Sequence, residues 1–386
     1  MPIADLPSVR LHYELEGPDD APVVMLSNSL MSNLSMWKPQ LPALLAAFRV
    51  LRYDTRGHGE SEVTAAPYSI EQLADDAAAL ITFTGVGPVH FAGLSMGGMI
   101  GQQLAIRHPD KVLSLSLCDT ASEMPTPAMW NDRLSTAREK GIAGLVDGTI
   151  KRWFVPDFVV KAADTIDEVR RMILTTPLEG YIGCASAVRD MSQTDLLKQI
   201  KAPTQVIVGR EDPACTLAQS QVLQNEIPGA VLHVIDDAAH LANIEKPAQF
   251  TQLLFDFIST QAASSASANN AISEHADTDT GTRYGAAVCR SGFSSAATRG
   301  APTGRGRATL THTSLVRWRG TRCQRRVSTH LSIAWPRTIC TCCRAPDYSV
   351  PCWYSRASTG RITAYYLTPW RSIRTDCVAL RSRMRV

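Results

Sequence analysis

Three side chains that are far apart in the sequence have the types and the settings that acyl-transfer chemistry needs. Ser95 lies within Gly-Leu-Ser-Met-Gly, where an apolar, strand-like run passes into small residues. Gly-x-Ser-x-Gly at a strand-to-helix junction is typical of a nucleophile elbow, which presents the serine above the sheet. A serine is a poor nucleophile until a base removes its proton. The motif therefore predicts a histidine and a carboxylate at the same edge of the fold.

His240 and Asp212 are the candidates for these two roles. His240 follows "VLHVIDDAA" and Asp212 follows "TQVIVGRE", so each comes just after an expected strand. The carboxylate of Asp212 would hold the imidazole in its useful tautomer and stabilise the imidazolium. The chain order Ser95, Asp212, His240 is that of the α/β-hydrolase arrangement. The alternative acids, which we consider weaker, are Asp119, Glu211, Asp236 and Asp237.

An acyl-transfer serine also needs hydrogen-bond donors for the oxyanion that develops in the transition state. The N–H of Met96, directly after the nucleophile, is one candidate. The N–H of Leu30, in the loop "LSNSLMSNLSMW" after an early strand, is the other. Asp54, in the loop "RYDTRGHGES", is expected to brace structure rather than to take part in chemistry.

The elements that must position these residues alternate along the chain. Strand-like runs such as "PVVMLSNS", "FRVLRYD" and "VLSLSLCDT" alternate with helical patterns, which predicts a mostly parallel, doubly wound α/β sheet. Residues 121–198 show only helical patterns and predict a cap inserted over the edge where ligands bind in such sheets. The expected core is 1–120 with 199–261, followed by a polar linker at 262–282 and a tail at 283–386.

Charge and cysteine content divide the chain near residue 261. The first part has 20 basic and 31 acidic residues and three cysteines without metal-binding spacing. No signal-peptide pattern opens it, and no apolar run reaches the length of a membrane helix. We expect a cytoplasmic enzyme that takes a small molecule as partner, with no metal, nucleic acid or membrane partner.

The first 261 residues resemble the α/β-hydrolases and, within that superfamily, the 3-oxoadipate enol-lactonases. The stretches that carry the resemblance are "LSNSL", "LRYDTRGHGES", "GLSMGGMIG", "RWFVPDF", "EGYIGCASAVRDMSQTDL" and "AAHLANIEKPAQF". One departure is Met31, where the family pattern usually has glycine. The resemblance implies a cofactor-free hydrolysis of an enol-lactone that bears a carboxylate, in bacterial catabolism of protocatechuate or catechol.

The substrate carboxylate implied by this resemblance needs a counter-charge in the pocket. A planar guanidinium suits a carboxylate because it donates two parallel hydrogen bonds. Arg152, next to Trp153 in "KRWF" of the cap, is the first candidate, and Arg133 and Arg189 are the alternatives. Two rival functions stay open: a broader carboxylesterase or carbon–carbon bond hydrolase on the same three residues, and a binding module without turnover.

The tail has a composition unlike that of the first region. It holds 19 arginines, no lysine and seven cysteines. A basic arm that attracts nucleic acid is one interpretation. We favour the hypothesis that the tail is an out-of-frame product, because GC-rich DNA read out of frame would produce this composition. The resemblance to enol-lactonases, some of which are fused to a decarboxylase at this place, implies a frame-shifted remnant of such a domain, with other read-through as the alternative. Either origin predicts disorder and no decarboxylase activity.

Overall fold

The computed structural model describes residues 2–124 and 127–278, and then the segments 309–318, 321–330, 337–345, 348–356 and 362–365. Contacts divide the chain into two units, Met1–Tyr284 and Gly285–Val386. All of the candidate site residues lie in the first unit, which the following paragraphs describe.

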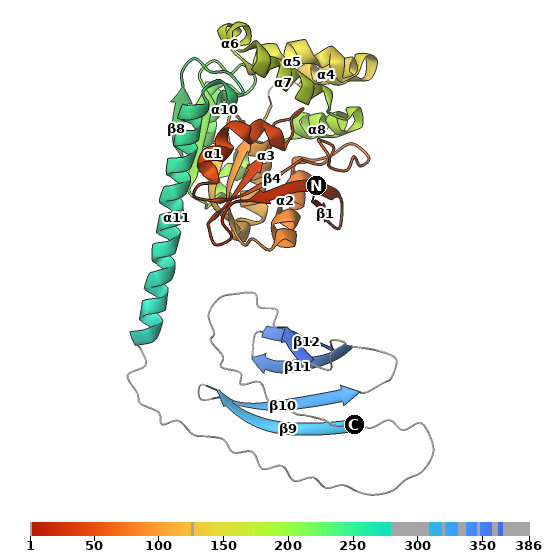
Figure 1. The fold of residues 1–386 in the computed structure, drawn as a ribbon, viewed down its shortest axis with the longest axis vertical. Helices are drawn as coiled ribbons and strands as arrows, with labels where there is room; N and C mark the ends of the chain where they lie inside the picture. The colour runs from red at the N-terminus through yellow and green to blue at the C-terminus, as the bar shows by residue number, and fades with distance from the viewer. Residues whose placement is uncertain are drawn as a thin grey trace, which may run out of the picture. The chain divides into compact units, whose positions relative to one another are not determined.

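The first unit is built on an eight-stranded sheet in the order β1-β2-β4-β3-β5-β6-β7-β8 (Figure 1). Its strands are β1 (Ile3–Asp5), β2 (Arg10–Glu16), β3 (Val23–Ser27), β4 (Arg49–Tyr53), β5 (Val89–Leu94), β6 (Val112–Cys118), β7 (Thr204–Gly209) and β8 (Val231–Ile235). β2 pairs antiparallel with both β1 and β4. The six strands in the spatial order β4-β3-β5-β6-β7-β8 pair parallel. The predicted mostly parallel, doubly wound sheet is confirmed. Strand order reverses at β3, and ligands bind beside such a reversal, beyond the carboxyl ends of the strands.

Helices cover the sheet along its length. α2 (Ile70–Thr84) and α3 (Met96–Arg107) pack against each other, and α3 contacts β3, β5 and β6. α9 (Leu217–Glu226) contacts β7 and β8, while α11 (Pro247–Thr278) contacts β6 and β8. The short elements α1 (Leu41–Leu44), α10 (Ala242–Glu245), η1 (Leu34–Gln40) and η2 (Pro109–Lys111) complete this layer. The loops that leave the carboxyl ends of β3, β5, β7 and β8 therefore emerge from a rigid support.

A block of helices separates β6 from β7. It consists of α4 (Pro127–Lys140), η3 (Ile142–Leu145), α5 (Val146–Trp153), α6 (Pro156–Lys161), α7 (Ala163–Leu174), α8 (Leu178–Asp190) and η4 (Thr194–Gln199). α4 to α7 lie together at one end of the sheet, at the top of Figure 1. On α7 the buried residues are Ile166, Val169 and Ile173, whose spacing forms one apolar stripe. The block is thus a packed cap inserted into the α/β fold.

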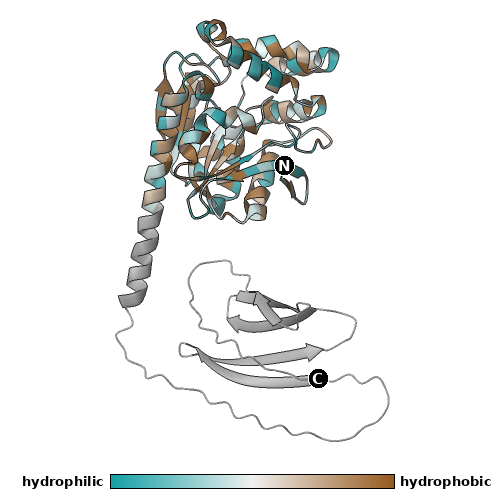
Figure 2. Ribbon diagram, in the orientation of Figure 1, coloured by the Kyte–Doolittle hydropathy of each residue, from teal (hydrophilic) through white to brown (hydrophobic). Residues whose placement is uncertain are grey.

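The apolar core follows the central strands. β3, β5 and β7 are buried at every position, as expected for parallel strands that are covered on both faces. Figure 2 shows apolar residues along these strands and a mixture of apolar and polar residues on the helices. The buried run from β5 into α3 means that the elements before and after Ser95 are packed in the core.

The C-terminal part of the chain differs from the sequence expectation in one respect. α11 continues to Thr278, so helix occupies most of the segment expected to be a linker, 262–282. Its residues after 247 include several alanines and neither glycine nor proline, so nothing in the sequence ends the helix early.

Within the tail, where we expect disorder, the described segments are the strands β9 (Thr309–Trp318), β10 (Thr321–His330), β11 (Arg337–Ala345), β12 (Tyr348–Arg356) and β13 (Ile362–Tyr365). β9 pairs with β10, and β12 pairs with both β11 and β13. The other tail residues, on which the same expectation falls, lie outside the described residues. Across the part of the chain that the structure describes, no helix combines the length and the apolar character that spanning a membrane requires.

Candidate active site

Ser95 occupies a strained turn between β5 and α3. Its backbone has φ 57° and ψ −118°, a conformation that L-residues rarely adopt. Four hydrogen bonds hold its backbone. The Ser95 N–H donates to Cys118 O at 2.9 Å, and Ser95 O accepts from the N–H groups of Gly98 at 2.9 Å and Met99 at 3.1 Å and from Thr120 Oγ1 at 2.7 Å. The strain is therefore balanced by contacts on both sides, as in a nucleophile elbow.

The glycines around Ser95 are required by close backbone approaches. A Cβ on Gly93 would lie 2.1 Å from Gly97 O, and a Cβ on Gly97 would lie 2.2 Å from Ser27 O, at the end of β3. A Cβ on Gly98 would lie 2.6 Å from the side chain of Thr120. β3, β5 and the start of α3 can meet this closely only because these positions lack side chains.

His240 and Asp212 meet at the same edge of the sheet. Asp212 follows β7 and His240 follows β8, and His240 Nδ1 lies 2.8 Å from Asp212 Oδ2. The second oxygen of Asp212 accepts the N–H groups of Ala214 at 2.7 Å and Cys215 at 3.0 Å. With Nδ1–H donated to Asp212, the basic nitrogen of His240 is Nε2. Ser95 and His240 line one pocket, so the structure brings all three predicted residues together.

The alternative acids have other surroundings. Glu211, Asp236 and Asp237 are exposed, and Asp236 pairs with Arg210. Asp119 is buried, and its Oδ1 accepts the Gly209 N–H at 2.7 Å. Burial, with the charge of Asp212, raises the pKa of Asp119 well above its usual range. Asp119 is therefore bonded to the backbone at the end of β7, and the carboxylate bonded to the imidazole is that of Asp212.

The two predicted oxyanion donors lie close to Ser95. Met96 is the first residue of α3, where backbone N–H groups lack partners within the helix. Leu30 lines the same pocket as Ser95 and His240. The next residue, Met31, has φ 66°, the left-handed conformation that favours the glycine of the family pattern. Met31 therefore adopts, at a cost in strain, a conformation that a glycine would adopt freely.

His58 holds the backbone of this loop in place. The Met31 N–H donates to His58 Nε2 at 3.1 Å. Burial lowers the pKa of His58 to about 4, so the ring is neutral near pH 7 and can accept this hydrogen bond. His58 lies in the loop "RYDTRGHGES", which therefore has a part in orienting Leu30 as well as in bracing the fold.

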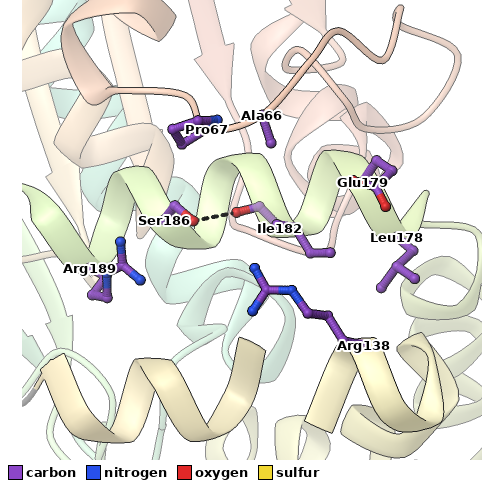
Figure 3. Close-up of a pocket in the computed structure, with 8 residues that line it drawn as sticks. All are labelled: Ala66, Pro67, Arg138, Leu178, Glu179, Ile182, Ser186 and Arg189. Carbon is purple, nitrogen blue, oxygen red and sulfur yellow. Dashed lines mark hydrogen bonds between the residues drawn. The ribbon is translucent and has the colours of Figure 1, made fainter. Parts of the chain in front are cut away.

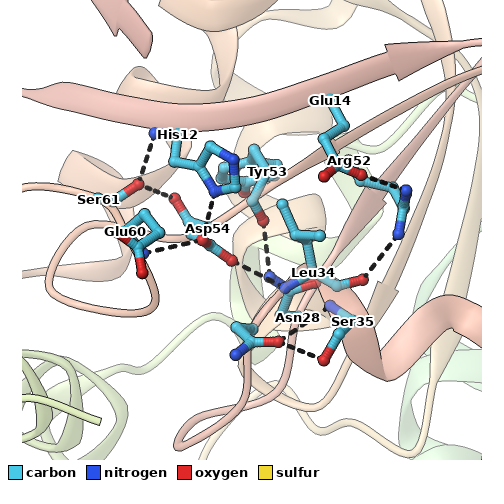
Figure 4. A network of polar contacts seen from close by, with 11 residues as sticks. His12, Glu14, Asn28, Leu34, Ser35, Arg52, Tyr53, Asp54, Glu60 and Ser61 are labelled. Atoms are coloured by element: carbon cyan, nitrogen blue, oxygen red, sulfur yellow. Dashed lines mark hydrogen bonds and ion pairs between the residues drawn. The ribbon is translucent and has the colours of Figure 1, made fainter. Parts of the chain in front are cut away.

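Asp54 fastens the other end of the same loop (Figure 4). Its Oδ1 accepts the Leu34 N–H at 2.8 Å, and its Oδ2 lies 2.7 Å from His12 Nδ1. Asn28 Nδ2 donates to Tyr53 O at 2.6 Å. These bonds tie the chain after β3 to the end of β4, so the carboxylate of Asp54 braces the loop that carries Leu30.

The pocket above Ser95 is mostly apolar and carries two cap arginines. Its apolar lining comes from Leu30, Met99, Met124, Met129, Trp130, Trp153 and Val188. Arg152, on α5, donates from Nη2 to Thr149 Oγ1 at 3.3 Å, and Arg133, on α4, lies over the ring of Trp130 at 4.5 Å. Burial and the charge of Arg133 lower the pKa of Arg152 to about 10. The ion pairs among the described side chains involve other arginines, so this pocket holds two positive charges with no carboxylate paired to them.

The third candidate, Arg189, lies elsewhere. It lines a separate groove with Arg138 and Glu179 beside α8 (Figure 3). Its guanidinium pairs with Asp190 at 2.6 Å and donates to Asn131 Oδ1 at 3.0 Å. Arg189 is thus removed from Ser95, and the choice among the three arginines narrows to Arg152 and Arg133.

Some pocket residues were not predicted from the sequence. Trp130 lies three residues before Arg133 on α4, and this helical spacing was the available signal for a shared face. Met99 and Val188 carry no such signal, because apolar residues on helices are ordinary core residues, and Met124 lies between β6 and α4, outside any periodic pattern.

A metal ion is a chemical alternative for one cluster at this site. Asp212, Cys215 and His240 place three possible ligand atoms within 4.8 Å of one another. Both oxygens of Asp212 already accept hydrogen bonds, and burial raises the pKa of the Cys215 thiol well above its usual range. A high thiol pKa opposes the thiolate that metal binding needs. Asp212 and His240 therefore fit a proton relay with Ser95 better than a metal centre with Cys215.

Comparisons with known proteins agree with this architecture. A family model described as the alpha/beta hydrolase family matches residues 27–253. 3-Oxoadipate enol-lactonase 2 of Acinetobacter baylyi is 34% identical over 242 residues, which are 63% of this chain and 90% of that protein. The putative carbamate hydrolase RutD of Stutzerimonas stutzeri is 29% identical over 67% of this chain and 100% of its own. The crystal structure of the enol-lactonase from Burkholderia xenovorans LB400 is 40% identical, with a TM-score of 0.66, over 67% of this chain and 100% of that one.

Substitution of Gly97 tests the close approach at the elbow. Gly97→Ala places a Cβ against the backbone of β3, so we expect the free energy of unfolding to fall by about 3 kcal/mol or more. Gly87→Ala is the matched control, because a Cβ there meets nothing within 4 Å; only its φ of 75° opposes it, at a cost of about 1 kcal/mol. Urea denaturation measures both. Equal losses in the two variants would contradict the packing described.

The neutral state of His58 predicts a pH dependence of stability. Its folded pKa lies below the usual 6.5, so the unfolded state binds more protons between pH 6.5 and 4. The stabilisation is thus complete above pH 6.5 and is lost as the pH falls toward 4. We expect the difference in unfolding free energy between parent and His58→Gln to shrink by about 2 kcal/mol from pH 7.5 to pH 5. A difference independent of pH, measured by urea denaturation, would show that His58 is not held neutral.

Proposed function

This chain belongs to the alpha/beta hydrolase family, and we propose that it hydrolyses 3-oxoadipate enol-lactone to 3-oxoadipate with Ser95, His240 and Asp212. The observation that carries the proposal is the pair of arginines in the Ser95 pocket, Arg133 and Arg152, which no carboxylate among the described residues neutralises. A substrate that brings its own carboxylate would complete this pocket. Its relatives named as 3-oxoadipate enol-lactonases, and a solved structure named as an enol-lactonase, support the same substrate.

The first half of the proposed reaction opens the lactone ring. Ser95 Oγ attacks the ring carbonyl carbon while His240 Nε2 accepts the hydroxyl proton, and Asp212 stabilises the imidazolium. The N–H groups of Met96 and Leu30 donate to the oxyanion. Collapse of the tetrahedral intermediate breaks the ring C–O bond. The leaving enolate takes the proton from His240 and becomes a ketone, which makes it a good leaving group.

The second half frees the enzyme. A water molecule gives a proton to His240 Nε2 and its oxygen attacks the acyl carbon. The second collapse returns the proton to Ser95 Oγ and releases the dicarboxylate product. The protein groups supply the base, the nucleophile and the oxyanion donors, so the proposed reaction needs neither a metal nor an organic cofactor. The activity would serve the bacterial catabolism of protocatechuate or catechol, in the cytoplasm, on a small molecule rather than on a macromolecular partner.

A broader carboxylesterase or a carbon–carbon bond hydrolase is the alternative with the same three residues. The relatives named as putative carbamate hydrolases belong to the same family and do not separate these possibilities. The charge of the pocket favours an anionic substrate, because two partly buried guanidinium groups disfavour a ligand that leaves them unpaired.

Ser95→Ala tests the nucleophile. We expect kcat/KM for the enol-lactone to fall by about 10⁴-fold or more, since the remaining groups supply only binding and oxyanion stabilisation. The assay is the loss of enol-lactone absorbance with the full chain. A variant as fast as the parent on p-nitrophenyl acetate would show that another group is the nucleophile.

Arg152→Ala tests whether the guanidinium group binds the substrate carboxylate. Loss of a charge-assisted hydrogen bond should raise KM for the enol-lactone about 10- to 100-fold. The kcat for p-nitrophenyl acetate, which has no carboxylate, should stay within about twofold of the parent value. Arg189→Ala, in the separate groove, is the matched control and should change neither constant. If Arg152→Ala impairs hydrolysis of both substrates equally, the arginine does not recognise the charge of the substrate.

A further inference from the structure

Glu245, the last residue of α10, links the catalytic histidine to the cap. Its side chain is buried, with 7% of the residue exposed. One carboxylate oxygen accepts the Val155 N–H at 2.7 Å, and the other accepts the Ala239 N–H. Ala239 directly precedes His240, and Val155 lies just after α5. A single carboxylate thus bridges the histidine loop and the end of the helix that carries Arg152.

A second bond runs parallel to this bridge. The Leu241 N–H donates to Trp153 O at 3.0 Å. The residues on both sides of His240 are therefore hydrogen-bonded, directly or through Glu245, to the end of α5. Arg152 and Trp153, which line the pocket, belong to the last turn of that helix.

The buried carboxylate of Glu245 depends on both of its hydrogen bonds. Burial raises the pKa of its carboxyl group, and the charge of Asp212 raises it further, whereas the two backbone N–H donors and Lys246 lower it. Burying a carboxylate is costly unless its oxygens are fully hydrogen-bonded, and here each oxygen has a donor. A carboxylate with two fixed acceptors holds two backbone segments at a set separation more strictly than apolar packing would.

We propose that Glu245 is a positioning residue that sets His240 relative to Arg152, and so couples the catalytic base to the recognition of the substrate carboxylate. The part concerning Arg152 rests on the proposed function, whereas the part concerning His240 holds for any ester that the enzyme cleaves. Glu245 acts through these two residues and does not itself contact the reacting atoms.

Glu245→Gln is the first test, because it keeps the size of the side chain and removes one acceptor. The amide NH₂ group then faces a backbone N–H donor, so one of the two ties is lost. Kinetics are expressed per active site, titrated with a fluorophosphonate that labels reactive serines. We expect kcat for p-nitrophenyl acetate to fall about 10-fold and KM for the enol-lactone to rise about 10-fold.

Val155→Pro cuts only the cap side of the bridge. Val155 has φ −66° and ψ 148°, and Phe154 before it is extended, so proline fits the backbone there while it removes the N–H donor. We expect KM for the enol-lactone to rise about 10-fold, with kcat for p-nitrophenyl acetate within about twofold of the parent. Equal effects on both substrates would overturn the division of roles. This variant also carries the test if Glu245→Gln does not fold.

A double variant tests whether Glu245 acts through Arg152. In an Arg152→Ala background, Glu245→Gln should leave KM for the enol-lactone unchanged, because the group that it positions is gone. Its effect on kcat for the neutral ester should persist. Independent, additive effects on KM would overturn the coupling.

Gln205→Met is the control for a purely structural effect. Gln205 is buried at the start of β7, and its Nε2 donates to Ser116 Oγ at 2.9 Å, at the strand end opposite Asp212. This variant should lower stability and leave the constants per active site unchanged. If Glu245→Gln behaves in the same way, the proposal for Glu245 fails.

The failure of the proposed function has a different signature. A parent protein that cleaves p-nitrophenyl acetate and not the enol-lactone would refute the proposed substrate, and kcat for the ester would then decide the role of Glu245 at His240. A parent that cleaves neither ester would overturn both proposals.

Discussion

The hydrogen bond between Asp212 and His240 is the interaction on which the site depends. It joins the loops after β7 and β8, and it selects the tautomer in which Nε2 of His240 is free to act as a base. Two backbone N–H groups orient Asp212, and its buried neighbour Asp119 is bonded to the Gly209 N–H rather than to the imidazole. The strained turn at Ser95 is useful only because this oriented imidazole lies at the same pocket.

The surroundings of this relay have two sides: a closely packed lower side, formed by the sheet and its loops, and a charged upper side, formed by the cap. Below, close backbone crossings at Gly93 and Gly97 and the neutral ring of His58 hold the elbow and the oxyanion loop. Above, the cap brings Arg133 and Arg152 over an apolar floor. The lower side suits acyl transfer in general, and the proposed function assigns to the upper side the choice of a substrate of complementary charge.

The sequence predicted the parts of this arrangement that depend on local pattern. Strand ends followed by Ser95, Asp212 and His240 were sufficient to expect a common edge, because parallel strands end there together. Interactions between segments distant in the sequence could not be predicted. Which arginine faces the pocket depends on how α4, α5 and α8 pack, and the sequence left Arg133 and Arg189 open beside Arg152. The left-handed conformation of Met31 and the bridge through Glu245 likewise depend on tertiary contacts, which sequence periodicity does not report. The length of α11 is different, because it follows from the absence of glycine and proline after residue 247, which is a local pattern.

Identification of the residue that becomes covalently modified tests the central claim most directly. The native protein would be treated with a fluorophosphonate, weighed intact by mass spectrometry and then digested for peptide mapping. The account predicts one phosphonyl adduct, on the peptide that contains Ser95, formed in parallel with the loss of hydrolysis and absent after heat denaturation. An adduct on a different residue that accompanies the loss of activity, or full activity in protein labelled at Ser95, would contradict it.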